Sequence, residues 1–255
     1  MSKQEQKSIF ITGAGSGIGR ATAQLFAERG WFVGLTDINQ AGLDETAALL
    51  PSGQRMSIPL DVRDRAQWAR AIEAFGQATG RRCHVLFNNA GIGKGGWLEE
   101  MAPEDIDLVL DVNLKGVING AIAALPLLRE TPGARIVNTA SVAGIVGAPK
   151  MAIYVATKFA VRGLTESLDA EYSRYGVRVT SLMPWFVDTA ILDALAERRL
   201  AVAANGAVLY TDAAGKVFDA HTGKTVAAAP ADAKSGAGAK AGAVANLGRL
   251  DIDVP

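Results

Sequence analysis

Cysteine and histidine are almost missing from this chain of 255 residues. Cys83 is the only cysteine, and His84 and His221 are the only histidines. A single cysteine cannot form a disulfide bridge within the chain, and it cannot supply the thiolates of a cysteine-based zinc site. The sequence therefore predicts no metal site, and it gives little support to a catalytic pair of cysteine and histidine.

An excess of charge of one sign is also missing. The chain has 26 Lys and Arg residues against 26 Asp and Glu residues, so its formal net charge is zero at pH 7. Proteins that bind nucleic acid or anionic membranes need basic side chains to neutralise phosphate groups. The first seven residues are polar, unlike a signal peptide, and no uninterrupted apolar run approaches the roughly 18 residues of a membrane span. We expect a cytoplasmic protein with no nucleic-acid or membrane partner.

Short apolar segments rich in β-branched residues alternate with helical patterns through the first 183 residues. Strands that are apolar on both faces and separated by helices are typical of a parallel sheet covered by helices on both sides. The predicted fold class is α/β, a doubly wound parallel sheet of the Rossmann type. The predicted strands span residues 8–12, 31–36, 55–59, 84–87, 134–139 and 177–183, and the predicted helices span residues 18–29, 43–50, 64–79, 103–129 and 151–175.

Glycine is abundant, with 28 residues, but its setting changes after Leu200. Alanine and glycine dominate residues 201–249, and most of this stretch has no helical or alternating period. Val208–Thr211 and Lys216–Phe218 could pair as a hairpin, and Leu247–Val254 could form a short last strand. The remainder has the composition of a flexible segment. We therefore predict a Rossmann-type domain over residues 1–200 and an atypical C-terminal segment over residues 201–255.

A glycine-rich loop, Thr12–Gly19, joins the first predicted strand to the first predicted helix. Glycines at such a junction let the backbone turn tightly and approach a pyrophosphate, whose charge the free N–H groups of the helix stabilise. A turn without a ligand could use the same glycines, but this loop has the strand before it and the helix after it that a dinucleotide site requires. We expect cofactor contacts from Gly13, Ser16, Gly17, Ile18 and Gly19.

An acidic residue, Asp37, ends the second predicted strand, eighteen positions after Gly19. At this spacing a carboxylate accepts hydrogen bonds from the adenosine ribose, whereas the 2′-phosphate of NADP would meet like charge. NAD is therefore favoured over NADP, the alternative being an ordinary surface Asp at a strand end. Further cofactor contacts are expected where later strands end, because open α/β sheets bind ligands at that edge. These are Asp61, Val62, Asn88, Ala90 and Gly91.

Tyr154 and Lys158 lie four residues apart in a predicted helix, so their side chains share one face. An ammonium about 4 Å away stabilises the phenolate by roughly 4 kcal/mol at an effective dielectric of 20. This is about the free energy needed to lower the pKa of a phenol from about 10 to near neutrality. Ser141 follows the fifth strand and could donate to a substrate carbonyl oxygen. Asn113 is a poor helix former inside a predicted helix, and its side-chain amide could hold a water that links Lys158 to solvent. Each residue alone has a structural explanation, but together they predict a catalytic group.

These motifs occur in the order and spacing of the short-chain dehydrogenase/reductase family, which the chain resembles over residues 8–192. The resemblance implies that Tyr154 is the general acid/base and that Lys158 lowers its pKa and holds the nicotinamide ribose. It implies that Ser141 polarises the carbonyl and that Asn113 completes a proton relay. It also implies a homodimer or homotetramer, and cofactor contacts from Pro184, Val187 and Thr189.

Two departures separate the chain from that family. Trp185 stands where the family usually has glycine, and residues 201–255 do not resemble the family's last helix and strand, which form a subunit interface and close the pocket. The substrate contacts that we expect are mostly apolar, which favours a small apolar carbonyl or alcohol substrate. They are Ser141, Val142, Met151, Trp185 and Phe186, with Trp97 as a further candidate.

The function that these features favour is an NAD-dependent oxidoreductase that interconverts a secondary alcohol and a ketone by hydride transfer. One alternative keeps the enzyme but makes it a 3-oxoacyl carrier reductase that uses NADPH. Another is a dinucleotide-binding sensor without turnover. A sensor needs only the glycine loop, so the presence of a full catalytic set argues against it.

Overall fold

The computed structural model describes residues 6–184, 199–202, 208–211 and 217–219. The chain divides into two units, Met1–Arg199 and Leu200–Pro255.

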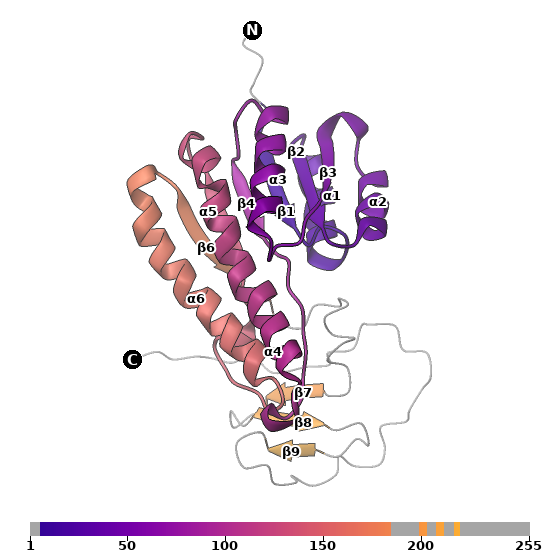
Figure 1. Cartoon of the computed structure of the whole chain (residues 1–255), viewed down its shortest axis with the longest axis vertical. Coiled ribbons are helices and arrows are strands. Elements are labelled where there is room, and N and C mark those ends of the chain that lie inside the picture. Colours follow the sequence, from indigo (N-terminus) through magenta and orange to yellow (C-terminus); the bar gives the residue numbers. More distant parts are fainter. Residues whose placement is uncertain (1–5, 185–198, 203–207, 212–216, 220–255) are drawn as a thin grey trace. The chain divides into compact units, whose positions relative to one another are not determined.

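The first unit is built on a six-stranded parallel sheet (Figure 1). From β1 the chain moves outward to β3 and then crosses to β4 on the other side of β1, so the carboxyl ends of β1 and β4 flank the point where ligands bind in such sheets. The doubly wound α/β fold predicted from the sequence is confirmed. The strands, in their spatial order, are β3 Arg55–Pro59, β2 Phe32–Asp37, β1 Ser8–Thr12, β4 Val85–Asn88, β5 Arg135–Thr139 and β6 Arg178–Leu182.

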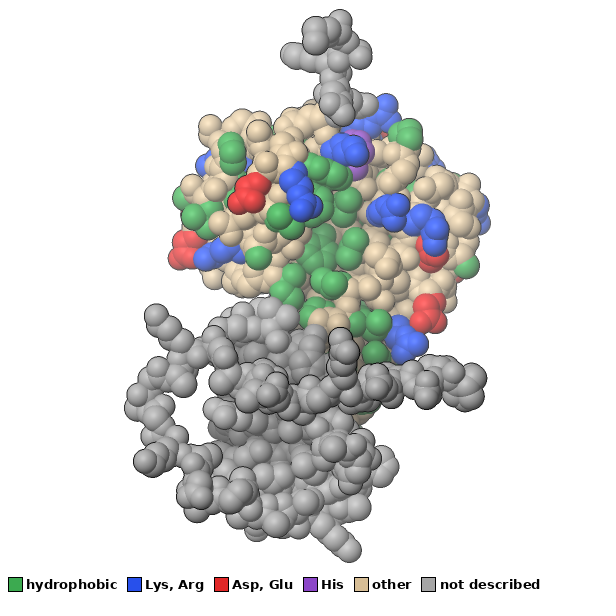
Figure 2. Space-filling model, turned by 180° about the vertical axis from the view of Figure 1, so that it is seen from behind, with side chains coloured by type: hydrophobic (Ala, Val, Ile, Leu, Met, Phe, Trp, Pro, Cys, Tyr) green, Lys and Arg blue, Asp and Glu red, His purple; other side chains and the backbone are tan. Residues whose placement is uncertain are grey.

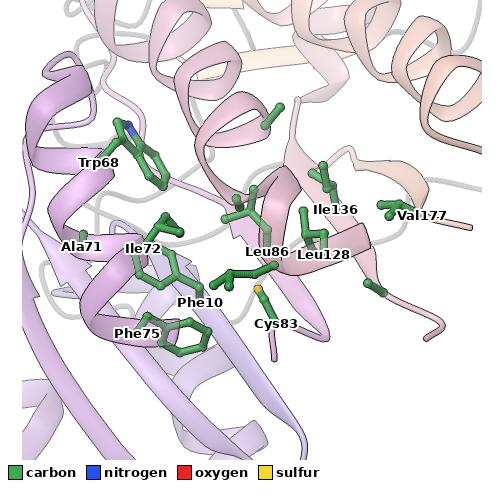
Figure 3. Close-up of a cluster of buried hydrophobic side chains, with 14 of the residues drawn as sticks. Phe10, Trp68, Ala71, Ile72, Phe75, Cys83, Leu86, Leu128, Ile136 and Val177 are labelled. Carbon is green, nitrogen blue, oxygen red and sulfur yellow. The ribbon is translucent and has the colours of Figure 1, made fainter. Parts of the chain in front are cut away.

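Helices cover the two faces of the sheet, and each face has its own core. Ile9 and Ile11 of β1 pack in a cluster with residues of α1 and α2, whereas Phe10 points the other way, toward α3, α5 and α6. Figure 3 shows this second cluster, in which the Phe10 ring meets the Phe75 ring edge-on at 5.1 Å between centroids. The main helices are α1 Gly17–Glu28, α2 Gln40–Ala48, α3 Arg65–Ala78, α4 Pro103–Leu110, α5 Gly116–Arg129 and α6 Ala152–Tyr172.

Most predicted boundaries differ from the observed ones by one or two residues, and the exceptions have local causes. The helix predicted from residue 43 begins at Gln40, because the Asn39 side chain caps it by accepting from the Gly42 N–H at 3.2 Å. The helix predicted to end at residue 175 finishes with the short 3₁₀ turn η5 (Ser173–Tyr175), followed by Gly176 at φ +73°. The remaining short elements are η1 Ser52–Gln54, η2 Leu98–Glu100 and η4 Val142–Gly144.

The long helix predicted over residues 103–129 contains a π-helical turn, η3 (Asp111–Lys115), between α4 and α5. Gly116 donates its N–H to the carbonyl of Asp111, five residues back. By length and composition this stretch could cross a membrane, although it has no uninterrupted apolar run. Its residues Ala124 and Leu128 nevertheless belong to the protein core. We therefore interpret it as a core helix of the globular fold.

Apart from Arg199, the second unit contains a three-stranded sheet, whose strands in order are β7 Arg199–Val202, β8 Val208–Thr211 and β9 Val217–Asp219. The pairing of β8 and β9 is antiparallel, with Tyr210 opposite Phe218. The predicted hairpin is thus confirmed, with its second strand beginning one residue later. The strand at residues 199–202 was not predicted from the sequence, because four residues are too few to show an alternating pattern. The strand predicted at Leu247–Val254 lies outside the described residues.

Figure 2 shows the first unit from behind, with apolar side chains forming a band down the middle of its described surface. Lys and Arg side chains on this face are interspersed with Asp and Glu side chains. This face therefore has no continuous basic stripe of the kind that a phosphate backbone requires.

Candidate active site

The glycine loop forms a backbone cradle between β1 and α1. Gly13 (φ +66°) and Gly17 (φ +48°) adopt conformations that L side chains rarely take. A Cβ at Gly19 would lie 2.0 Å from the carbonyl oxygen of Gly13, so that position accepts only glycine. Ala14 donates its N–H to the carbonyl of Thr36 at 3.0 Å, which fixes the loop against β2. The cradle is thus shaped by bare backbone.

The N-terminus of α1 faces this cradle without a side-chain cap. Ser16 is the N-cap residue, but its exposed side chain accepts no capping hydrogen bond, and the first turn has no acidic side chain. The next residues of the loop are the exposed Gly17 and the half-buried Ile18. A helix start of this kind presents N–H donors and a positive dipole end to an anion.

Asp37 points its carboxylate at the cradle. Its Oδ2 accepts from the Gly15 N–H and its Oδ1 from the Asn39 N–H, both at 2.9 Å. Two carboxylate oxygens offer about four acceptor sites, so both can still accept from ribose hydroxyls. Arg20 is the neighbouring cation, but its guanidinium is held by the Gly15 carbonyl and by the Glu45 carboxylate at 2.7 Å. Its Nε and Nη2 groups are therefore already engaged within the protein.

A second loop, after β4, is fastened to the cradle by Thr12 and Asn89. The Thr12 hydroxyl accepts from the N–H groups of Asn89 and Ala90, both at 3.0 Å, and Asn89 Nδ2 donates to the Thr12 carbonyl at 3.1 Å. A Cβ on Gly13 would lie 2.9 Å from the Cα of Ala90, so the two loops touch. Thr12 and Asn89 stand in two segments that the sequence indicated, at the ends of the first and fourth strands, but no role was predicted for either side chain.

Asn88, predicted as a cofactor contact, turns its side chain into the core. Its Nδ2 donates to Asn138 Oδ1 at 2.9 Å, and Asn138 Nδ2 donates to Thr165 Oγ1 at 3.0 Å, which links β4, β5 and α6. The Asn88 Oδ1 faces Gly120, where a Cβ would lie only 2.3 Å away. A cofactor contact from Asn88 could therefore come only from its main chain.

Asp61 and Val62 follow β3 at the same edge of the sheet. Arg63 binds the Asp61 carboxylate, with Nη2 and Oδ2 2.6 Å apart, and this hydrogen bond lowers the pKa of Asp61. Val62 is buried, and its carbonyl accepts from the indole N–H of Trp68 at 2.9 Å. These contacts are structural, so cofactor binding by the two residues stays a prediction.

Tyr154 and Lys158 share one buried face of α6, as their spacing predicted. Their exposed fractions are 7% and 3%. Lys158 Nζ donates to the carbonyl of Thr139 at 2.9 Å and lies 5.4 Å from the centre of the Tyr154 ring. A Cβ on Gly91 would lie 3.7 Å from Lys158 Nζ and 3.3 Å from Asn113 Oδ1. The structure therefore brings four of the predicted residues together.

Burial changes the acidity of both side chains in the ligand-free protein. It raises the pKa of Tyr154, against the smaller opposing effect of a hydrogen bond with Ser141. It also lowers the pKa of Lys158 to about 8. The net shift of the Tyr154 pKa in the ligand-free protein is therefore upward, and its lowering by Lys158 stays a prediction. Desolvation disfavours the charged form of both side chains, the phenolate of Tyr154 and the ammonium of Lys158.

Ser141 begins the turn η4, where its Oγ accepts from the Ala143 N–H at 3.1 Å. The adjacent Val142 is half-buried and donates its N–H to the carbonyl of Pro184 at 3.1 Å, so Pro184 lies beside this turn. Met151, half-buried, comes directly before α6. The other predicted contacts on this side, Trp185, Phe186, Val187 and Thr189, lie outside the described residues.

Asn113 lies in the π turn, and both the oxygen and the nitrogen of its side-chain amide make hydrogen bonds within the protein. Oδ1 accepts from the Ile92 N–H at 2.8 Å, and Nδ2 donates to the Ile92 carbonyl at 2.9 Å. Nδ2 also approaches Thr157 Oγ1 at 3.4 Å. The buried amide thus binds the backbone of the β4 loop, and its role as a water ligand for Lys158 stays a prediction.

Comparison with known proteins agrees with this arrangement. The family model described as short chain dehydrogenase matches residues 7–200. The chain belongs to the short-chain dehydrogenase family. A 3-oxoacyl-(acyl-carrier-protein) reductase of Thermotoga maritima is 40% identical over 197 residues, which are 76% of this chain and 79% of the relative. A cyclohexanol dehydrogenase of an Acinetobacter species is 37% identical over 195 residues, 74% of this chain and 76% of the relative.

Among solved structures, a 3-ketoacyl-(acyl-carrier-protein) reductase of Brucella melitensis in complex with NADH matches with a TM-score of 0.71. It is 32% identical, and the match covers 74% of this chain and 80% of that one. The site fits a dinucleotide of this kind, because the cradle is bare backbone that side chains would fill and the α1 N-terminus is uncapped. This chain is thus an oxidoreductase of the short-chain dehydrogenase family with a nicotinamide cofactor site.

Proposed function

We propose that this protein is an NAD-dependent oxidoreductase that interconverts a secondary alcohol and a ketone, with Tyr154 as general acid/base. The observation that carries the proposal is the group formed by the buried Tyr154 and Lys158 with the half-buried Ser141, at the sheet edge that also bears the glycine cradle. The cyclohexanol dehydrogenase among the relatives supports the same reaction class. A small apolar substrate, a homo-oligomer and a cytoplasmic location stay predictions from the sequence.

NAD, when bound, supplies the hydride acceptor and donor. The phenolate of Tyr154 receives the proton of the alcohol in oxidation, and the phenol so formed donates that proton to the carbonyl oxygen in reduction. Ser141, hydrogen-bonded to Tyr154, orients the same substrate oxygen. Lys158 Nζ, held by the Thr139 carbonyl, places a positive charge beside Tyr154 in a site with little water, where it favours the phenolate more than it would in bulk solvent.

The preference for NAD over NADP rests on Asp37. Its carboxylate faces the cradle and accepts from the Gly15 N–H, so a 2′-phosphate there would meet a negative charge. Arg20, the nearby cation, is bound to Glu45 and to the Gly15 carbonyl. Both features disfavour a phosphate on the ribose.

A 3-oxoacyl carrier reductase is a second candidate, because the Thermotoga maritima reductase is similar over three quarters of the chain. The Brucella melitensis reductase was solved with NADH, so the cofactor alone does not separate the two candidates. The substrate does separate them. Turnover of apolar ketones and secondary alcohols supports the first, and turnover confined to acetoacetyl thioesters supports the second.

The decisive experiment combines a substrate screen with Tyr154→Phe. NADH-linked and NADPH-linked turnover of apolar ketones, secondary alcohols and an acetoacetyl thioester is measured on the full chain. We expect Tyr154→Phe to abolish turnover while NADH binding, measured by titration calorimetry, changes by no more than a few fold. Tyr172→Phe is the matched control, because Tyr172 is also a buried tyrosine of α6. Near-normal turnover in Tyr154→Phe would show that the proton donor is misassigned, and NADH binding without turnover of any substrate would favour the sensor.

A further inference from the structure

Two loops that leave the sheet next to the candidate site are joined through Gly96 and Lys150. One loop follows β4 and the other lies between η4 and α6, and β4 and β5 are neighbours in the sheet. The Gly96 N–H donates to the Lys150 carbonyl at 2.8 Å. Lys150 Nζ lies over the indole of Trp97, 4.7 Å from the ring centre. Lys150 thus contacts two consecutive residues of the β4 loop, Gly96 through its backbone and Trp97 through its side chain.

Lys150 is kept in a conformation that L residues rarely adopt, at φ +62°. Such a conformation persists only where the surroundings impose it. The surroundings here include the start of α6, since the residue that follows, Met151, accepts the Val155 N–H at 2.8 Å. Lys150 is therefore fixed directly before the helical turn that carries Tyr154.

The ammonium of Lys150 has no carboxylate partner within the described parts of the chain. Its contact is the indole face, and a cation over an indole ring is attracted by the ring quadrupole. The other lysine of the β4 loop, Lys94, is paired with Asp105 at 2.9 Å, which fastens that loop to α4. The loop is therefore fixed on both sides of Gly96, once by an ion pair and once by Lys150.

Apolar side chains on the two joined loops remain exposed to solvent. Trp97 is 41% exposed, and Ile145 and Val146 are exposed to a similar degree. Tyr154 and Ser141 lie at the same edge of the sheet. A rigid indole binds an apolar ring at low entropic cost, because little side-chain freedom is lost on binding.

We propose that the contact between Trp97 and Lys150, here named the clasp, determines substrate specificity. It fixes the indole beside the substrate position and so tightens the binding of cyclic apolar alcohols relative to short open-chain ones. This role rests on the proposed function of the site. The clasp acts on binding and leaves the proton transfer at Tyr154 unchanged.

The test compares KM and kcat for cyclohexanol and butan-2-ol with saturating NAD. We expect Trp97→Leu to raise KM for cyclohexanol by about fivefold to tenfold, with KM for butan-2-ol and both kcat values within twofold. Lys150→Met, which keeps the side-chain length, should raise KM for cyclohexanol by about twofold to fivefold. Lys150→Arg keeps the cation and should leave KM for cyclohexanol near that of the unaltered protein. The double variant Trp97→Leu with Lys150→Met should resemble Trp97→Leu alone, because both changes remove the same contact.

Two further variants separate the clasp from general stability. Lys150→Gly relieves the positive φ and should raise the melting temperature, yet it should raise KM for cyclohexanol as Lys150→Met does. Lys7→Met removes a comparable contact, in which Lys7 Nζ lies 5.6 Å from the centre of the Trp31 ring at the start of the sheet. It should leave both KM values unchanged.

The outcomes distinguish the clasp from the enzyme itself. An unchanged ratio of the two KM values in Trp97→Leu and Lys150→Met overturns the clasp and leaves the proposed function standing. The same holds if kcat falls equally for both alcohols together with the melting temperature, since that marks a structural role only. Absence of NAD-linked turnover of either alcohol by the unaltered chain overturns the proposed function, and the role of the clasp with it.

Discussion

Replacing Lys158 by methionine should stabilise the ligand-free protein while abolishing its turnover. The side chain is 3% exposed, and burial lowers its pKa from 10.5 to about 8. The difference, 10.5 − 8 = 2.5, means that burial disfavours the charged form by about 3 kcal/mol. Methionine fills a similar volume without a charge, but it loses the hydrogen bond to the Thr139 carbonyl, which contributes about 1 kcal/mol. The expected net gain at pH 7 is about 2 kcal/mol.

The gain should depend on pH in a defined direction. The folded-state pKa of Lys158, about 8, lies below its ordinary value of 10.5, so the unfolded chain binds more protons between these two values. The stability of the unaltered protein therefore rises with pH in this window. Methionine does not titrate, so the advantage of Lys158→Met is full below pH 8 and is lost as the pH approaches 10.5.

Urea unfolding at pH 7 and pH 10, followed by circular dichroism, measures this difference. At pH 7 the melting temperature of Lys158→Met should also be higher by about 4–8 °C. Lys115→Met is the matched control, because Lys115 is exposed and paired with Asp111 on the surface, and it should change stability by less than about 0.5 kcal/mol at either pH. The reasoning fails if Lys158→Met is no more stable at pH 7, or if its advantage is as large at pH 10.

Three further substitutions test the cofactor end and the π turn. Asp37→Ser should weaken NAD binding about tenfold and shift preference toward NADP, measured by calorimetric titration of both, and an unchanged preference would contradict the assignment. Gly19→Ala places a Cβ 2.0 Å from the Gly13 carbonyl oxygen, so NADH binding should fall at least about tenfold in the same assay, and full binding would show that the cradle is adaptable. Asn113→Ala should cost about 2–3 kcal/mol in urea unfolding, because the N–H and carbonyl of Ile92 lose their partners, and a loss below about 1 kcal/mol would contradict this.

The fold could be predicted because its signals are local. Strands buried on both faces appear as short apolar runs, and the helices between them keep their own period, so the six strands and their succession along the chain can be predicted from the sequence. The π turn at Asp111–Lys115 could not be predicted, because one extra residue in a turn barely alters the apolar pattern of a helix. The start of α2 depended on the Asn39 cap, which lies outside the apolar period used to place the helix.

The candidate site divides in the same way. Tyr154 and Lys158 share a face because four residues make slightly more than one helical turn, and the glycine cradle is one continuous segment. The contacts of Thr12 with Asn89, and of Lys150 with Gly96, join segments that are far apart in sequence. The spacing of residues in the sequence does not predict these contacts, because they depend on β1, β4 and β5 being neighbours in the sheet.

Asn113 shows why identifying a residue differs from identifying its role. Asn113 was identified because asparagine is a poor helix former. This indicates only that the residue is needed there for a reason other than helix formation. The oxygen and the nitrogen of the buried amide both bind the backbone of Ile92. Ile92 follows Gly91, where a Cβ would lie 3.7 Å from Lys158 Nζ. A side chain at Gly91 would crowd both Asn113 and Lys158. The two hydrogen bonds of Asn113 therefore hold the β4 loop close to Lys158.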